Sequence, residues 1–166
     1  MRRAGIPEDS LRNCNDAEFL KAIALDETAN LSERNEALNG LRMSKDAILL
    51  PLLSSILANK SWGPDYQSYA MQHLDLAMMH MIDQPGYVTA TLGAYTSEEN
   101  VIPVRREAIF GLLEIPTTRD YGLRVLSDCI RSGKSSNFGD LYTRALKDYN
   151  LPPDPGILAC LDNQKK

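Results

Sequence analysis

The chain has 166 residues, of which 43% are hydrophobic and 24% charged, and its formal net charge is −4. This balance predicts one folded domain or one short repeat array, and it excludes a disordered chain and a modular multi-domain enzyme. The acidic balance also disfavours nucleic-acid binding, because contacts with phosphates require concentrated positive charge. The charge is uneven along the chain, since residues 51–100 carry a net charge of −4 and residues 101–148 a net charge of +2.

Neither a membrane span nor a secretory signal is expected. No segment contains the roughly 18 apolar residues that a membrane-spanning helix needs, and the first ten residues lack the apolar core of a signal peptide. The three cysteines, Cys14, Cys129 and Cys160, are far apart and include no Cys-x-x-Cys pair, which indicates a reducing compartment. We therefore predict a cytoplasmic protein, with Cys129 as a small core residue of a helix.

Apolar residues recur with a helical period along almost the whole chain, and no segment shows the strict alternation of a strand. The sequence therefore predicts an all-α protein. Thr117, followed three residues later by Asp120, resembles the capping box that begins a helix. Short polar, proline or glycine breaks separate the helices, which we expect at 17–25, 32–43, 46–59, 65–82, 86–95, 104–114, 119–131 and 138–149.

A weak internal repeat connects the second helices of successive helix pairs. Four small anchor residues, Ala37, Ala70, Ala108 and Ala145, are separated by 33, 38 and 37 residues. In the first three copies a leucine follows the alanine after four residues, and in the fourth copy a tyrosine does. A small residue allows two helices to approach closely, and the larger residue one turn later fills the space between neighbouring pairs.

These segments resemble the HEAT-repeat family, in particular its short bacterial members. The resemblance is carried by the Val-Arg-x-x-Ala pattern and the glycine and leucines that follow it, in Arg34, Ala37, Leu38, Gly40 and Leu41 and in Pro103, Val104, Arg105, Ala108, Gly111 and Leu112. Gln67 and Tyr142 replace the arginine in the other two copies. The resemblance implies a right-handed α-α superhelix of about four antiparallel helix pairs. A compact helical bundle is the alternative.

The resemblance defines three parts of the chain. Residues 1–15 are an N-terminal extension, 16–149 the helical repeat domain, and 150–166 a C-terminal extended segment with a short capping helix. Prolines at 152, 153 and 155 prevent a continuous helix there, while Ile157, Leu158 and Leu161 form one apolar face.

No motif predicts catalysis, a cofactor or a metal site. The chain contains neither a Gly-x-Ser-x-Gly nor a His-Glu-x-x-His sequence. Its two histidines, His73 and His80, are two helical turns apart, which is too far for both to bind one metal ion from a straight helix. We expect both to flank the apolar stripe of their helix. Met71, Met78 and Met81 are expected to fill the core, whereas Met79 is expected on the surface.

In HEAT-like stacks the second helices line a concave surface, so we project each helix from its anchor alanine. Positions two before, two after and five after the anchor are predicted to face away from the core. Among them, Arg106, Phe110 and Leu113 combine cationic, aromatic and aliphatic groups, as binding hot spots do. The predicted partner-binding residues are Arg106, Phe110, Leu113, Gln72, Asp75, Met79, Asn39 and Arg42.

The sequence therefore predicts a non-catalytic interaction module that binds a protein or peptide on its concave face. The acidic middle part of the chain favours a partner with a basic segment. Two alternatives remain open. The resemblance also implies a HEAT-like enzyme, such as a DNA base glycosylase or a bilin lyase, and the chain could be the terminal fragment of a longer solenoid.

Overall fold

The structure is a computed structural model that describes residues 8–42 and 46–163. The residues in these two ranges form ten α-helices, a 3-10 turn and a π-helical turn, and they include no β-strand. The prediction of an all-α chain is confirmed. The chain divides into two compact units, Met1–Ala77 and Met78–Lys166, each with its own core.

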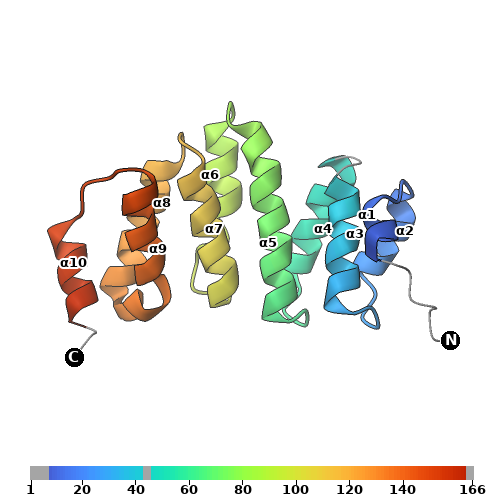
Figure 1. Ribbon diagram of the computed structural model, residues 1–166, viewed down its shortest axis with the longest axis horizontal. Helices are drawn as coiled ribbons and strands as arrows, with labels where there is room; N and C mark the ends of the chain where they lie inside the picture. The colour runs from blue at the N-terminus through green and yellow to red at the C-terminus, as the bar shows by residue number, and fades with distance from the viewer. Residues whose placement is uncertain (1–7, 43–45, 164–166) are drawn as a thin grey trace. The chain divides into compact units, whose positions relative to one another are not determined.

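Helical hairpins make up both units (Figure 1). The first unit contains α1 (Glu8–Arg12), α2 (Ala17–Ala24), α3 (Leu31–Arg42), α4 (Asp46–Ala58) and nearly all of α5 (Pro64–Met78). The second unit contains the 3-10 turn η1 (Met79–Met81), α6 (Pro85–Gly93), α7 (Ile102–Glu114), α8 (Arg119–Cys129), the π-helical turn η2 (Ile130–Lys134), α9 (Ser135–Asp148) and α10 (Pro155–Asp162).

The predicted helices are confirmed with small shifts at their ends. α1 is an addition, because its five residues lie in the segment predicted as an extension. The helix predicted at 65–82 is shorter, since α5 ends at Met78 and continues as the 3-10 turn η1. Met43, the predicted end of another helix, lies outside the described residues. The short C-terminal helix is present as α10.

Local side-chain hydrogen bonds define several helix starts. Asn30 and Glu33 form a reciprocal capping box at α3, in which each side chain accepts the other's backbone N–H at 2.9 Å. Asp154 accepts from Gly156 and Ile157 at the start of α10. The capping box predicted for Thr117 is wrong, because the N-cap of α8 is Thr118. The Thr118 hydroxyl instead donates to the Leu112 carbonyl at 2.8 Å, which connects α8 to the end of α7.

The four anchor alanines are buried, as the repeat predicts. In the first unit, α1 and α2 approach α3 at Gly40, where an added Cβ would lie 2.6 Å from the Leu11 carbonyl oxygen. In the second unit, α8 approaches α7 at Gly122, where an added Cβ would lie 3.0 Å from Cβ of Leu112. Close helix contacts in both units therefore depend on residues without large side chains.

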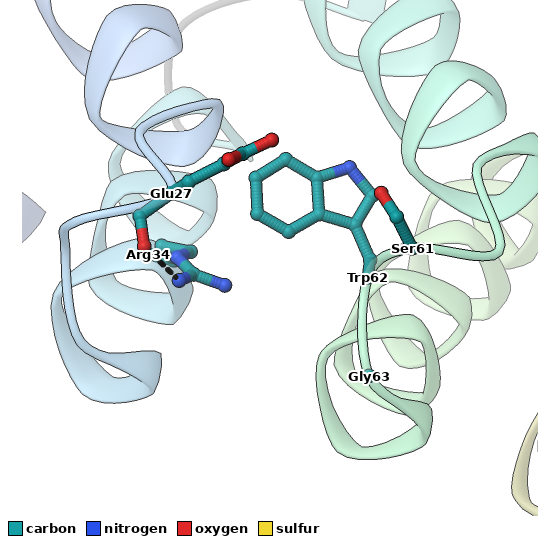
Figure 2. A pocket seen from close by; sticks show the side chains of 5 residues that line it. All are labelled: Glu27, Arg34, Ser61, Trp62 and Gly63. Atoms are coloured by element: carbon teal, nitrogen blue, oxygen red, sulfur yellow. Dashed lines mark hydrogen bonds between the residues drawn. The ribbon is translucent and has the colours of Figure 1, made fainter.

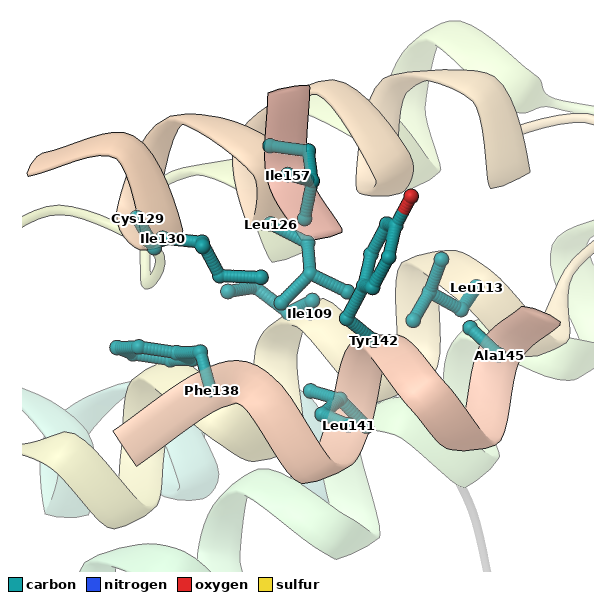
Figure 3. Close-up of a cluster of buried hydrophobic side chains, with 10 residues drawn as sticks. All are labelled: Ile109, Leu113, Leu126, Cys129, Ile130, Phe138, Leu141, Tyr142, Ala145 and Ile157. Carbon is teal, nitrogen blue, oxygen red and sulfur yellow. The ribbon is translucent and has the colours of Figure 1, made fainter. Parts of the chain in front are cut away.

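The core of the second unit gathers side chains from four helices and η2 (Figure 3). Phe138 and Tyr142 of α9 lie among aliphatic residues of α7, α8 and η2, and Ile157 of α10 is buried against the same cluster. Burial of large apolar side chains supplies most of the favourable free energy of such a unit. The C-terminal helix is thus part of the core. The cluster contains Ile109, Leu113, Leu126, Cys129, Ile130, Phe138, Leu141, Tyr142, Ala145 and Ile157.

One polar contact recurs at three of the four repeat positions. Arg34 Nε donates to the Asp26 carbonyl at 3.1 Å, and Arg105 Nε donates to the Thr96 carbonyl at 3.0 Å. Gln67 stands at the same position, and its Nε2 donates to the Asn59 carbonyl at 2.9 Å. Each side chain therefore connects the start of its helix to the loop that precedes it. Tyr142 departs from this pattern, because its hydroxyl accepts from the backbone N–H of Asp154.

Candidate functional site

Helices α7 and α9 pack against each other and place a row of polar and aromatic side chains on their shared surface. Arg106 forms a bidentate ion pair with Asp140, with Nη1–Oδ1 at 2.8 Å and Nη2–Oδ2 at 2.6 Å. Arg106 Nη1 also donates to the Asn137 carbonyl. The hydrogen bonds from Arg106 lower the pKa of Asp140, and those to Asp140 raise the pKa of Arg106. Arg106 is therefore held in one orientation while its side chain is still 33% exposed.

One turn along α7, Phe110 is half-buried and lies under the guanidinium of Arg144, which is 5.1 Å from the ring centroid. Arg144 also pairs with Asp148 at 3.0 Å. Cation–π contacts of this kind stabilise an arginine over an aromatic face. The ring of Phe110 thus lies beneath a charged group and does not form the open apolar surface that the sequence predicts.

At the far end of the row, the Tyr149 hydroxyl donates to Glu114 Oε1 at 2.7 Å. Burial and this hydrogen bond to a carboxylate raise the pKa of Tyr149 to about 12. The guanidinium of Arg119 covers the same ring at 3.9 Å from its centroid. We call this row the α7–α9 face, and define it as Arg106, Phe110, Glu114, Asp140, Arg144, Asp148 and Tyr149.

Two of the predicted partner-binding residues are not on an exposed face. Leu113 is 1% exposed and belongs to the core shown in Figure 3, and Asp75 is 4% exposed. Their predicted exposure is wrong because α5 and α7 each have buried residues around most of their circumference. A projection from one anchor residue assumes a single buried stripe, and it fails for a helix that is covered on several sides.

The other predicted residues have different surroundings. In the first unit, Gln72 and Arg42 are exposed, whereas Asn39 is half-buried and donates to Glu36 Oε1 at 3.1 Å. In the second unit, Met79 is half-buried in η1. The structure brings Arg106 and Phe110 together on one face. Three other predicted residues, Asn39, Arg42 and Gln72, belong to the first unit. Their role in binding stays a prediction.

The acidic and basic residues of α9 are the members of the α7–α9 face that the sequence projection missed. Counted from the anchor Ala145, its outward positions are Thr143, Lys147 and Asn150, whereas Asp140 and Arg144 are the side chains that reach α7. The sequence does contain a pattern that indicates this surface, because Asp140, Arg144 and Asp148 follow one another at four-residue spacing. Alternating charges at this spacing favour a paired, solvent-facing helix surface.

His73 is buried on α5, as expected for a residue beside the apolar stripe, whereas His80 is exposed. His73 Nε2 lies 3.0 Å from Asn35 Oδ1, and its Nδ1 has no hydrogen-bond partner among the described residues. Burial, reinforced by the positive charge of Arg42, lowers the pKa of His73 to about 4. The residue is therefore a neutral imidazole at physiological pH.

Cys129 is a buried core residue, which confirms its predicted role. Arg105 Nη2 lies 3.3 Å from its Sγ, and the Arg105 guanidinium is 5.2 Å from the ring centroid of Phe138. Burial raises the pKa of the Cys129 thiol and outweighs the opposing charge of Arg105. The site therefore holds a neutral thiol, which is the unreactive form of cysteine.

Within the two described ranges, no group of three or more histidine, cysteine, aspartate or glutamate side chains is arranged to bind a metal ion. None of the helices described is both long and apolar enough to cross a bilayer. Comparisons with protein-family models, with curated proteins and with solved structures find no match to this chain.

Proposed function

We propose that this protein is a non-catalytic interaction module of HEAT-like helical repeats, which binds a protein or peptide segment through the α7–α9 face. The repeated contact of Arg34, Gln67 and Arg105 with the preceding loop supports the repeat interpretation. In this proposal the helix pairs stack as a solenoid. Solution scattering tests the stacking, since a compact domain of this length has a radius of gyration of about 15 Å and a solenoid a larger one.

The α7–α9 face is the observation that carries the binding proposal. Its charged side chains are already fixed by internal contacts, by the Arg106–Asp140 pair and by the stacking of Arg144 on Phe110. A partner would therefore meet an ordered surface and would lose little additional side-chain entropy on binding. Arginine and tyrosine are also the residue types enriched at energetically important positions of protein interfaces.

The charges of this face indicate a partner segment that carries both positive and negative side chains. Arg106 and Arg144 alternate with Asp140 and Asp148, and all four side chains are at least partly exposed. The hypothesis of a basic partner depended in part on Asp75, which is buried. We therefore propose a segment with an apolar side chain that contacts Phe110, flanked by an acidic and a basic residue.

Affinity capture from a lysate of the source cell tests this proposal with two matched variants. Arg144→Glu inverts a charge on the α7–α9 face. Arg124→Glu makes the same change on the exposed side of α8, where Arg124 lies 5.7 Å from the ring centroid of Tyr121. Both variants should keep the far-ultraviolet circular dichroism of the wild type, because both side chains are exposed.

We expect a protein that wild type and Arg124→Glu retain and that Arg144→Glu loses. A truncation series of that protein then identifies the bound segment. Equal retention by both folded variants would show that the α7–α9 face is not the binding surface.

A further inference from the structure

A second candidate site lies in the first unit and contains no residue of the α7–α9 face. A cavity of about 340 Å³ opens between the α2–α3 turn and the α4–α5 turn (Figure 2). Its walls are polar or aromatic, and its volume is at the lower end of the range for small-molecule sites, about 300 to 1,000 Å³. It is lined by Glu27, Arg34, Ser61, Trp62 and Gly63.

Arg34 is fixed at one side of this cavity by four contacts. Its Nε and Nη2 donate to the carbonyl oxygens of Asp26 and Glu27, both at 3.1 Å. Its guanidinium lies 4.8 Å from the ring centroid of Trp62 and 5.2 Å from that of Tyr66. These contacts leave Nη1 without a partner among the described residues. The cavity therefore contains a preorganised cation with an N–H₂ group available for a ligand.

Two further polar groups of the lining have no hydrogen-bond partner within the described part of the chain. One is the carboxylate of Glu27, since Arg34 bonds the backbone carbonyl of Glu27 and not its side chain. The other is the indole N–H of Trp62. Ser61 Oγ donates to Asn59 Oδ1 at 2.7 Å, so its lone pairs are left to accept a hydrogen bond.

We propose that this cavity binds a free α-amino acid or a similarly small amino carboxylate. The ligand's carboxylate would accept from Arg34 Nη1 and its ammonium group would donate to Glu27, since both side chains lie on the same side of the Trp62 ring (Figure 2). A ligand with only a negative charge would meet the carboxylate of Glu27, and one with only a positive charge would meet Arg34. A zwitterion satisfies both groups at once. This site is independent of the α7–α9 face.

Trp62 makes the proposal directly testable, because it is the only tryptophan of the chain and lies in the cavity wall. Its fluorescence, excited where tyrosine does not absorb, is followed while the full-length protein is titrated with each of the common α-amino acids. Acetate, methylammonium and an N-acetyl amino acid amide serve as probes that lack one or both charges. At least one amino acid should give a saturable change, and the three control probes should bind at least about tenfold more weakly.

The variant Glu27→Gln removes the charge of the anionic group without disturbing an internal contact of its side chain, and it should weaken amino-acid binding by about tenfold or more. Glu18→Gln is the matched control, since Glu18 is an exposed glutamate of the same unit that does not line this cavity. It should bind like the wild type. The melting temperature should rise with ligand concentration in both proteins, and at each concentration by less in Glu27→Gln than in wild type.

Three results would overturn the proposal. In the first, no amino acid gives a saturable change in Trp62 emission. In the second, acetate or methylammonium binds as tightly as the amino acid. In the third, Glu27→Gln binds with unchanged affinity.

Discussion

Arg34 and Arg105 stand at the same position of two repeats, three residues before a buried alanine, and each Nε donates to a carbonyl oxygen of the loop before its helix. Each guanidinium also lies over an aromatic ring that comes later in the chain, Trp62 for Arg34 and Phe138 for Arg105. The second arginine of the Arg105–Arg106 pair instead points to α9 and pairs with Asp140. Two adjacent arginines thus have different roles.

This difference predicts losses of stability of different size for the same substitution. Arg105 is 4% exposed, and Arg105→Ala would leave the Thr96 carbonyl without its partner, so we expect it to lower the free energy of unfolding by about 2 to 4 kcal/mol. Arg106→Ala removes a partly exposed ion pair and should cost less than about 1 kcal/mol. Urea unfolding followed by circular dichroism measures both values. Equal losses of the free energy of unfolding in the two variants would contradict the different roles of Arg105 and Arg106.

Leu113 and Phe110 are one turn apart on α7 but differ in burial. Leu113→Ala should lower the free energy of unfolding by about 2 to 5 kcal/mol, because it leaves a cavity in the core of the second unit. Phe110→Ala should cost less, since the ring is only half-buried. Thermal unfolding of the two variants compares them. A larger loss for Phe110→Ala would place the core on the other side of α7.

Gly40 is predicted to tolerate no side chain. Gly40→Ala would place Cβ 2.6 Å from a backbone oxygen of α1 and 2.9 Å from Leu20 Cδ1, so α1 or α2 would have to move. We expect a loss of about 1 to 3 kcal/mol. Gly86→Ala is the control, because an added Cβ there meets no atom within 4 Å. In a helix this change should be neutral or stabilising by up to about 1 kcal/mol. Chemical denaturation of both variants decides whether the close approach exists.

The buried His73 predicts a specific dependence of stability on pH. Its pKa falls from 6.5 to about 4 on folding, so the unfolded chain binds more protons between these values. The free energy of unfolding should therefore be highest above pH 6.5 and should decrease as the pH falls toward 4, by about 3 kcal/mol in total.

His73→Gln tests this dependence. The difference between wild-type and variant free energies of unfolding, measured by urea titration across this pH range, isolates the histidine from the carboxylates. A difference that does not change with pH would show that His73 is accessible to protons in the folded protein.

Cys129 should react slowly with thiol reagents. Its pKa is raised and its side chain is buried, so little thiolate is present or accessible near neutral pH. Cys14 and Cys160 are half-buried and should be alkylated first. Mass spectrometry of peptides after timed treatment with iodoacetamide gives the order. Addition of urea should equalise the three rates, and fast labelling of Cys129 in the folded protein would contradict its burial.

The sequence alone determined every described α-helix except α1. Local periodicity and chain breaks are sufficient for this, since a helix forms from contacts between residues close in sequence. The buried anchor alanines and the core position of Cys129 could be predicted for the same reason, because each lies on the apolar stripe of its own helix.

Only the tertiary structure decided which outward positions are exposed and which polar groups meet. Leu113 and Asp75 are buried because α7 and α5 have buried residues on several sides, and the sequence of one helix does not show which of its sides are covered. The Arg106–Asp140 pair joins residues 34 positions apart, and the cavity at Trp62 is formed by two separate turns. Such sites depend on long-range packing, which the helical period of any one segment does not encode.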